Sequence, residues 1–455
     1  MAAEGSSGGE SRRAASEYEA VDAELLQRGF TRMVFEKARI ESLLDLLGNP
    51  QRAYPSIHLT GTNGKSSTAR MIDALLAAHG LRTGRYTSPH LASVRERISL
   101  DGEPISEARF VEVYRDVAPL AALVDQQYDE PLTYFDMTTT LAFAAFADAP
   151  VDVGIVEVGL GGETDSTNVL SAQVCVLTPI GLDHTEWLGD TIGDITQMKL
   201  GIVGKGATLI AATQPEEAVA PILEHCAEVG ATLAREGSEF GVLRRALAIG
   251  GQQLTLQGLS GVYDEVFLPL HGGHQAQNAA VALAAVEAFL GAGTQRELDP
   301  AVVREGFAAV SVPGRLERVR SSPTVLLDAA HNPSGMAATG QALLEEFSFR
   351  RLVAVLAVLG DKDVRGMLDE LEPVVDAVVV TRNSSPRAMP TDELAALARQ
   401  VFGPERVSVA DNLLEAVDTA VTLAESEAEA ALGGAGVVVT GSVVTVADAR
   451  KMFAR

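Results

Sequence analysis

A glycine turn that carries a lysine and two serines is the part of the chain best suited to chemistry. Residues 56–70 read S-I-H-L-T-G-T-N-G-K-S-S-T-A-R. Apolar residues before the turn predict a buried strand, and spaced apolar residues after it predict a helix. Backbone N–H groups of such a turn, with the helix N-terminus, bind anionic oxygens. With Lys65 as a positive charge and Ser66 or Ser67 as a hydroxyl, the stretch predicts a phosphate-binding loop.

The spacing within this loop is unusual. Two residues separate Gly61 from Gly64, where the common P-loop has four. As a bare pattern it is weak, and an ordinary strand-to-helix turn with Lys65 at the surface is the alternative. We favour the phosphate-binding loop because a predicted strand and a predicted helix flank it.

A carboxylate stands at the end of a second predicted strand. Residues 151–158 read V-D-V-G-I-V-E-V, and a glycine-rich loop follows them. Because open parallel sheets bind ligands at the carboxyl ends of their strands, Glu157 is a candidate magnesium ligand. A capping carboxylate that faces water is the alternative. His184 and Lys199 are two further candidate site residues. An isolated histidine is more often a structural residue, and an isolated lysine is more often at the surface.

The composition restricts the class of protein. With 61 acidic and 36 basic residues, the net charge of −25 argues against nucleic acid or an anionic membrane surface as a partner. Cys175 and Cys226 are the only cysteines and cannot form a disulfide framework. No apolar run reaches the length of a membrane span. We therefore predict a cytoplasmic monomer that acts on small molecules.

The order of predicted elements indicates an α/β fold with two domains. Residues 1–16 are small and polar and predict a disordered lead. Alternating strands and helices over residues 17–312 predict a doubly wound, P-loop-type ATPase domain, with a small antiparallel appendage between 233 and 268. The break S-V-P-G-R-L-E at 311–317 predicts a domain boundary. Residues 313–455 resume the alternation and predict a smaller Rossmann-like domain.

Several motifs occur in an order typical of one family. They are G-T-N-G-K-S-S, T-S-P-H-L, E-V-G-L-G-G-E-T-D-S-T-N, L-D-H, a lysine fifteen residues on, H-Q-A-Q-N, P-G-R-L-E and D-A-A-H-N-P-S-G. From about Met33 to the C-terminus the chain resembles the folylpolyglutamate synthases and dihydrofolate synthases of the Mur ligase superfamily. The resemblance implies ATP-dependent amide formation, in which a folate carboxylate takes the γ-phosphate of ATP and the amine of L-glutamate then displaces phosphate.

The resemblance also implies roles for single residues. The positions that match ATP-binding residues are Gly64, Lys65, Ser66, Ser67, Asn278, Arg315 and Asp328. Two magnesium sites are implied, with ligands Ser88 and Glu157 in one and Glu157, His184 and a carbamylated Lys199 in the other. The positions that match catalytic residues are Lys65, Glu157, His184, Lys199 and His331. The family's usual K-A-G is K-L-G here, so the bulkier Leu200 follows the lysine.

The acid substrate is expected at the segment L-T-Y-F-D and in the loop after Glu157. A similar L-T-Y-F-E segment contacts dihydropteroate in bacterial enzymes that have both activities, and Asp136 is one methylene shorter than that Glu. The matching residues are Thr133, Tyr134, Phe135, Asp136, Thr164, Asp165 and Ser166. A flat pterin favours an aromatic face such as Phe135. The alternative is a plain helix start, with Thr133 as N-cap and Phe135 in the core.

We predict polyglutamylation of reduced folates as the main activity and ligation of dihydropteroate as a second one. A cell-wall amino-acid ligase of the same superfamily is an alternative, but it would need a nucleotide-sugar domain before the phosphate loop, where only about sixty residues stand. A kinase or a non-catalytic ATP-binding regulator is another. ADP release that requires both a folate and glutamate separates the ligase from these alternatives.

Overall fold

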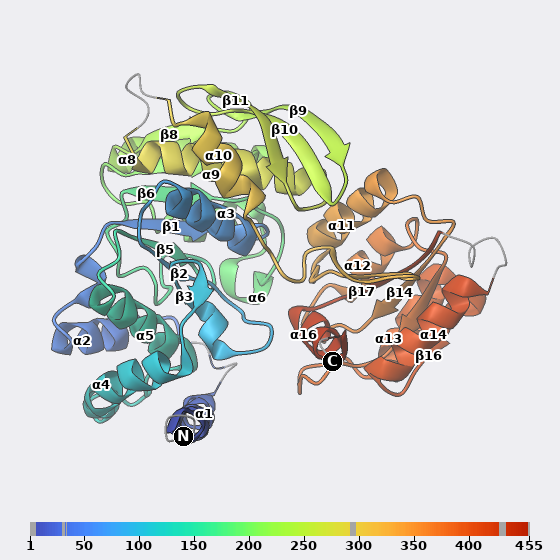
Figure 1. The fold of residues 1–455 in the computed structure, drawn as a ribbon, viewed down its shortest axis with the longest axis horizontal. Coiled ribbons are helices and arrows are strands. Elements are labelled where there is room, and N and C mark those ends of the chain that lie inside the picture. The colour runs from blue at the N-terminus through green and yellow to red at the C-terminus, as the bar shows by residue number, and fades with distance from the viewer. Residues whose placement is uncertain (1–5, 30–31, 33, 292–296, 427–433, 454–455) are drawn as a thin grey trace. The chain divides into compact units, whose positions relative to one another are not determined.

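The computed structural model describes residues 6–29, 32, 34–291, 297–426 and 434–453. The chain divides into two compact units. Unit 1 comprises Met1–Leu243, Thr255–Val266 and Asn278–Val310, and unit 2 comprises Arg244–Leu254, Phe267–Gln277 and Ser311–Arg455. Figure 1 follows the chain from the N-terminal helix to the C-terminal one.

Unit 1 is built on an eight-stranded sheet with the order β4-β3-β2-β5-β1-β6-β7-β8. Its central strands are parallel, while β3 pairs antiparallel with both β2 and β4. The bounds are β1 Ser56–Thr60, β2 Thr83–Tyr86, β3 Ile98–Leu100, β4 Glu103–Pro104, β5 Val153–Glu157, β6 Val174–Leu177, β7 Thr208–Ala211 and β8 Thr232–Arg235. Leu59 of β1 lies beside Glu157 of β5, so these two strands end at the same edge.

The helices of unit 1 cover this sheet in groups. Apolar residues of α1, α2, α4 and α5 form one buried cluster, which is visible as neighbouring helices in Figure 1. A second cluster joins α7 and α8 to β6 and β7. The bounds are α1 Ser6–Leu26, α2 Ala38–Leu46, η1 Pro50–Arg52, α3 Lys65–Ala78, η2 Val94–Arg97, α4 Glu107–Asp125, α5 Tyr134–Asp148, α6 Thr185–Leu188, α7 Ile192–Leu200, α8 Glu216–Val229 and α10 Pro300–Ala308.

A three-stranded sheet with the order β11-β10-β9 corresponds to the predicted appendage. Its strands are β9 Gly241–Ala248, β10 Gly251–Gln257 and β11 Val262–Leu268, and helix α9 Gly273–Phe289 follows. The division into units falls within these strands and within α9, because residues 244–254 and 267–277 belong to unit 2. The sequence predicted a single boundary near residue 312, and these two earlier segments were not anticipated.

Unit 2 has a six-stranded sheet with the order β12-β13-β17-β14-β15-β16. All neighbouring pairs are parallel except β12 with β13, and this antiparallel edge strand was missed from the sequence. The strands are β12 Glu317–Ser321, β13 Thr324–Leu327, β14 Arg351–Leu356, β15 Ala377–Val380, β16 Val407–Val409 and β17 Ala435–Thr440. The helices are α11 Pro333–Glu346, α12 Val364–Leu371, α13 Thr391–Phe402, η3 Pro404–Arg406, α14 Leu413–Glu425 and α16 Val443–Phe453.

The N-terminal lead differs from the expectation. Residues 6–16 belong to α1, whereas their small, polar composition predicted disorder; residues 1–5 lie outside the described part. The helix is fixed further along by Tyr18, whose ring lies 5.7 Å from that of Phe110, and by the fully buried Leu25. Packing at that end favours the helix, because a helix that is already formed extends at the gain of one hydrogen bond per residue. Within the described residues, no helix combines the length and the apolarity needed to cross a membrane.

Candidate active site

The phosphate-binding loop has a backbone that only glycine adopts easily. Gly61 and Gly64 have φ values of 141° and 89°. A Cβ on Gly61 would stand 1.9 Å from Thr178 Oγ1, and one on Gly64 would stand 2.6 Å from Asn278 Oδ1. Gly64 is the N-cap of α3, so the first N–H groups of that helix have no intrahelical acceptor. The predicted strand, turn and helix are present, and Asn278 lies against the turn.

Lys65 bends back over this loop. Its Nζ donates to the carbonyl oxygens of Gly61 at 2.9 Å and Thr62 at 3.1 Å. The ammonium is therefore held above the turn by the backbone itself. A phosphate bound to the loop N–H groups would meet this charge.

Ser66 and Ser88 both contact Glu157. Ser66 Oγ lies 2.9 and 2.8 Å from the two carboxylate oxygens, and the Ser88 N–H donates to Oε2 at 3.3 Å. Glu157 is the last residue of β5 and is 2% exposed. The end of β5, the start of α3 and the turn after β2 thus meet at one buried carboxylate.

A magnesium ion suits the donors of this group. Carboxylate and hydroxyl oxygens are the hard ligands that Mg²⁺ prefers, and it usually keeps waters and phosphate oxygens beside one or two protein groups. Among the described residues, no group of three or more His, Cys, Asp or Glu side chains is arranged to hold a metal ion.

Lys199 is buried beside the phosphate-binding loop. The residue is 4% exposed, and its Nζ donates to Gly61 O at 2.9 Å. Burial first, and the charge of Lys65 second, lower the pKa of Lys199 to about 7. The amine is therefore neutral in a large fraction of molecules near neutral pH and can act as a nucleophile. Leu200 is buried in an apolar cluster, which accommodates its bulk.

His184 stands at the N-terminus of the short helix α6. Its backbone is left-handed, with a φ of 52°, and its Nε2 lies 3.8 Å from Asp183 Oδ2. Asp183 also interacts electrostatically with Lys199. Asp183 was not among the predicted residues, although it stands directly before His184 in L-D-H.

The segment L-T-Y-F-D begins helix α5, and Thr133 is its N-cap. Thr133 Oγ1 accepts from the Asp136 N–H at 3.0 Å, and Asp136 Oδ2 accepts from the Thr133 N–H at 2.8 Å. Thr133 therefore caps the helix as the alternative predicted, but Phe135, which the same alternative placed in the core, is not fully buried. Phe135 is half-buried, and a Cβ on Gly159 would stand 2.4 Å from its Cζ. Tyr134 is buried, with the Arg97 guanidinium 5.3 Å from its ring centre.

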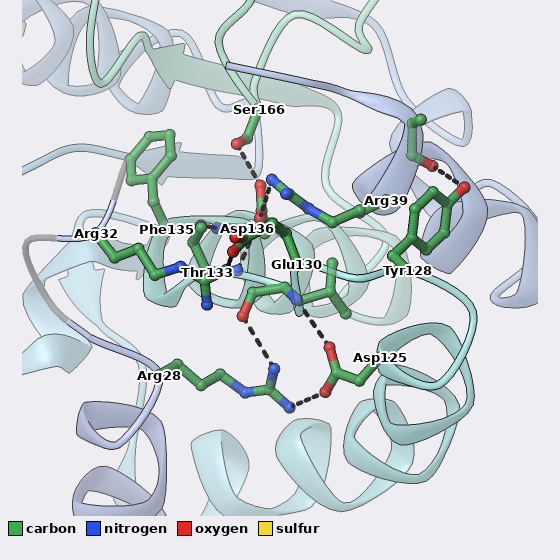
Figure 2. Close-up of polar contacts among 12 residues, drawn as sticks. Arg28, Arg32, Arg39, Asp125, Tyr128, Glu130, Thr133, Phe135, Asp136 and Ser166 are labelled. Carbon is green, nitrogen blue, oxygen red and sulfur yellow. Dashed lines mark hydrogen bonds and ion pairs between the residues drawn. The ribbon is translucent and has the colours of Figure 1, made fainter. Parts of the chain in front are cut away.

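Asp136 connects this helix to the loop after Glu157. Ser166 Oγ donates to Asp136 Oδ1 at 2.6 Å, and Arg39 Nη2 lies 3.4 Å from Oδ2. Figure 2 shows Ser166 and Arg39 reaching the carboxylate from different elements. Arg39 was not predicted, because nothing in the local sequence relates α2 to a carboxylate 97 residues away.

Asp165 organises its own loop. Its Oδ1 accepts from the Thr167 N–H at 2.9 Å and from Thr167 Oγ1 at 2.5 Å, while Oδ2 accepts from the Leu160 N–H at 2.9 Å. Burial raises the pKa of this carboxyl above its usual value. Thr164 beside it is half-buried. The carboxylates of Asp136 and Asp165 are therefore both occupied by groups of the chain.

In unit 2, the predicted nucleotide-binding residue Asp328 lies directly after β13, whereas Arg315 lies just before β12. Asp328 Oδ2 accepts from the Leu316 N–H at 3.0 Å, and Oδ1 accepts from the Ala330 N–H at 3.0 Å and from Thr339 Oγ1 at 2.8 Å. His331 Nδ1 lies 2.9 Å from Ala329 O. His274 interacts with the charges of Asp328 and Arg315, and its pKa is lowered mainly by burial. His274 was not predicted from the sequence, but it interacts electrostatically with Asp328 and Arg315, which were.

Sequence profiles of two domains match the chain. The Mur ligase middle domain matches residues 59–286, and the glutamate ligase domain of Mur ligases matches residues 314–443. The chain is 53% identical over 444 residues to the dihydrofolate synthase/folylpolyglutamate synthase of Mycobacterium tuberculosis, which covers 93% of this chain and 91% of that protein. It is 38% identical over 361 residues to the folylpolyglutamate synthase of Lacticaseibacillus casei, with 79% and 84% of the two chains covered.

Solved structures agree with this similarity. The M. tuberculosis folylpolyglutamate synthase complexed with ADP superposes with a TM-score of 0.93 at 52% identity, over 97% of this chain and 99% of that one. A complex of FPGS with AMPPCP and folate superposes with a TM-score of 0.82 at 32% identity, over 96% and 99% of the two chains.

Proposed function

The chain belongs to the folylpolyglutamate synthase/dihydrofolate synthase family of the Mur ligases, and on this premise we propose that it joins L-glutamate to the γ-carboxylate of folates with the hydrolysis of ATP to ADP and phosphate. The observation that carries the proposal is the phosphate-binding loop, with Lys65 over the turn and Ser66 on Glu157. A kinase would need the loop but would not need the glutamate ligase domain that matches residues 314–443.

The reaction has two steps. A carboxylate oxygen of the folate attacks the γ-phosphorus of ATP, so that an acyl phosphate forms and ADP leaves. The amine of L-glutamate then attacks the acyl carbon, an amide bond forms, and phosphate leaves with the former carboxylate oxygen. Such phosphoryl transfer needs mainly positioning and stabilisation of the charge on the transferred group.

The loop residues meet that need. The N–H groups after Gly64 and the Lys65 ammonium face the place where a phosphate would bind, and Ser66 and Ser67 open the helix beside it. Asn278 lies against Gly64 in the same unit, and its contact with the nucleotide is part of the proposal. For Arg315, Asp328 and His331 in unit 2, contact with the nucleotide or the transferred group is part of the proposal.

Two magnesium sites belong to the proposal. Ser88 and Glu157 would hold one ion, and Glu157, His184 and Lys199 would hold the second. When bound, such ions neutralise charge on the phosphate oxygens. Ser66 Oγ already donates to Glu157, which keeps the carboxylate directed at the loop.

We propose that Lys199 is carbamylated. A neutral amine attacks carbon dioxide and loses one proton, which yields an anionic carbamate in place of a cation. The pKa of about 7, caused by burial and by Lys65, favours the neutral amine that this reaction requires. The product would also remove the repulsion between two ammonium groups that both contact Gly61 O.

The acid substrate is proposed to bind between the start of α5 and the loop after Glu157. The residues concerned are Thr133, Tyr134, Phe135, Asp136, Thr164, Asp165 and Ser166. Phe135 is half-buried and offers its ring to a flat ligand, while Tyr134, Asp136 and Asp165 are buried. Dihydropteroate is proposed as a second acid, because the relative at 53% identity is named for both activities.

A substrate panel tests the proposal. Purified protein is given tetrahydrofolate, dihydropteroate or no acid, each with ATP and with or without glutamate, and products are identified by mass. We expect ADP release that depends on both acid and glutamate, together with glutamylated products. ADP release without an acid would support an ATPase or a kinase instead. If dihydropteroate gives no dihydrofolate while tetrahydrofolate is elongated, the second activity is absent.

Phe135→Ala sharpens the assignment of the acid site. Dihydropteroate has no glutamate tail, so its binding depends more on its ring system than the binding of a folate does. We expect the variant to lose about tenfold in kcat/KM with dihydropteroate, and less with tetrahydrofolate. An equal loss with both acids would indicate that Phe135 only packs against Gly159.

A further inference from the structure

A buried ion pair joins helix α2 to the start of α5. Arg39 and Asp136 have side chains that are each 1% exposed, with 3.4 Å between Nη2 and Oδ2. The Nε and Nη1 atoms of Arg39 are buried and have no hydrogen-bond partner among the described residues. A charged pair that is desolvated and only partly satisfied contributes little to stability, and an apolar pair of similar volume is often no worse. Stability therefore does not explain this pair.

The carboxylate of Asp136 instead connects two segments of the proposed acid site. Its Oδ2 accepts from the Thr133 N–H at 2.8 Å, and its Oδ1 accepts from Ser166 Oγ at 2.6 Å. One oxygen thus holds the start of α5, and the other holds the loop after Glu157. The Arg39 guanidinium lies beside this carboxylate, which accepts at both of its oxygens.

Other basic residues near the N-terminus hold the same two segments. Arg28 Nη1 donates to Leu132 O at 3.1 Å and pairs with Asp125 at 3.0 Å, and Asp125 in turn accepts from the Leu132 N–H at 2.8 Å (Figure 2). Lys37 Nζ donates to Asn168 O at 3.1 Å, at the end of the loop. The segment before α5 and the loop are therefore held by Arg28, Lys37 and Arg39, which stand close together in the sequence.

We propose that Arg39 is a positioning residue for the acid substrate, which acts through Asp136 to fix Thr133 and Ser166 relative to each other. Asp136, which the proposed function places in the acid site, then acts there as a positioning residue through its bonds to Thr133 and Ser166. The inference rests on one part of the proposed function, namely that Thr133 and Ser166 contact the acid substrate. It also accounts for an Asp at this position, because the shorter side chain caps α5 and still reaches Ser166.

The first test separates positioning from stability through the kinetic constants. Arg39→Met removes the charge and keeps an unbranched side chain, while Arg39→Lys keeps the charge without the planar fork. We expect Arg39→Met to raise the KM for the acid about tenfold, with kcat and the KM values for ATP and glutamate within about twofold. Arg39→Lys should rescue part of this loss. If Arg39→Met does not fold, the test uses Arg39→Lys. Its KM for the acid should then rise while kcat and the KM values for ATP and glutamate stay within about twofold.

The second test uses the double variant Arg39→Met with Asp136→Asn. Arg39→Met alone leaves a buried carboxylate without its cation and should lower the melting temperature. Replacing Asp136 by the neutral amide should restore much of the melting temperature. The acid KM should stay raised, because an amide has a single oxygen and cannot accept from both Thr133 and Ser166.

Arg85→Met is the matched control. Arg85 and Asp73 also form a buried pair, with side chains 2% and 5% exposed and 2.8 Å between Nε and Oδ2. Loss of this pair in Arg85→Met should lower the melting temperature without a selective rise in the KM for the acid.

Three results overturn the inference while the proposed function stands. They are an unchanged acid KM in both Arg39 variants, a rise of all three KM values together, and an acid KM that recovers with the melting temperature in the double variant. A wild-type protein that ligates glutamate to no folate and to no dihydropteroate would overturn the proposed function first, and the inference with it.

Discussion

The two large sheets of the molecule bury different kinds of residue. In unit 1, His58, Arg85 and Glu157 lie within strands β1, β2 and β5, and none is more than 2% exposed. In unit 2, the strands β13, β15 and β17 are apolar between their ends, and the buried polar groups Asp328, Thr381 and Thr440 stand at or just after the carboxyl ends. His58 and Arg85 are thus ionisable groups buried between the ends of their strands and Glu157 is buried at the end of β5, whereas Asp328, Thr381 and Thr440 all stand at or just after strand ends.

We interpret this difference as a cost in stability that the sheet of unit 1 bears because it holds ionisable groups near the candidate site. A buried ionisable group is tolerated only with a partner, and Arg85, His58 and Glu157 each have one. Arg85 pairs with Asp73, His58 lies 2.9 Å from Thr167 Oγ1, and Glu157 accepts from Ser66. We therefore expect changes around the sheet of unit 1 to alter activity or pH dependence. Surface changes in unit 2 should leave both nearly unchanged.

Lys65→Ala should have the largest effect. The ammonium donates to the loop carbonyls of Gly61 and Thr62, and it would neutralise charge on the transferred phosphate. We expect a loss on the order of 10³-fold in kcat/KM, with a change in unfolding free energy below about 1 kcal/mol. Steady-state ADP release and urea unfolding measure the two quantities. The exposed Lys205→Ala is the control, and near-normal turnover of Lys65→Ala would remove the phosphate-site assignment.

Lys199→Ala tests the carbamate. We expect a loss on the order of 10²-fold in kcat, partly restored by acetate or formate, because a small carboxylate can occupy the vacated space. Lys199→Arg should be equally inactive but should not be rescued, since its side chain fills that space with a fixed positive charge. Native mass spectrometry under carbon dioxide should show one added carbon dioxide on the active wild type. An unmodified mass in fully active protein would contradict the carbamate.

His58 should make the stability of unit 1 depend on pH. Burial lowers the pKa of His58 to about 3, whereas an unfolded histidine titrates near 6.5. Between these values the unfolded chain binds more protons than the folded one, so stability falls as pH falls. From pH 7 to pH 5 this amounts to about 2 kcal/mol, which His58→Gln should not show. Urea unfolding can be followed by the fluorescence of Trp187, which is the only tryptophan and lies in unit 1.

Asp165 is the neighbour that could obscure this result. It reaches His58 through Thr167, and burial raises the pKa of its carboxyl. A raised carboxyl pKa has the opposite effect, because the folded state then binds more protons and stability falls as pH rises. Comparing the wild type with His58→Gln at each pH cancels this contribution as long as Asp165 keeps its bonds to Thr167. Equal pH dependence in the two proteins would show that His58 is protonated without cost in the folded state.

Local patterns made most of the fold predictable. The strand, the glycine turn and the helix around Lys65 were placed correctly, because burial and turn chemistry act over a few residues. The antiparallel strand β12 was missed since its burial is low and its residues are mostly polar. The lead at residues 6–16 was assigned by composition, but tertiary packing of Tyr18 and Leu25 decides it.

The candidate site likewise contains residues that the sequence predicted and residues that it did not. Ser66, Ser88 and Glu157 come from separate motifs, and the topology of β1, β2 and β5 brings them together as a parallel sheet must. Arg39 could not be found, because a buried partner of Asp136 depends on how α2 packs on α5. The division of the appendage between the two units was equally invisible, since no composition change marks residues 244–254 or 267–277.

The smallest effect is expected on the surface of unit 2. Arg365 and Asp369 form a pair one turn apart on α12, with Nε 3.0 Å from Oδ1, and their side chains are 54% and 50% exposed. Exposed pairs of this spacing contribute about 0.3–0.5 kcal/mol, because water screens the charges and both side chains lose rotamer freedom. Arg365→Ala should therefore change the unfolding free energy by no more than that and leave all kinetic constants unchanged. Since α12 packs its buried face, including Met367 and Leu368, into the apolar cluster of unit 2, Leu368→Ala on the same helix should cost about 2–5 kcal/mol. A measurable change in any KM from Arg365→Ala would show that the exposed face of α12 contributes to substrate binding.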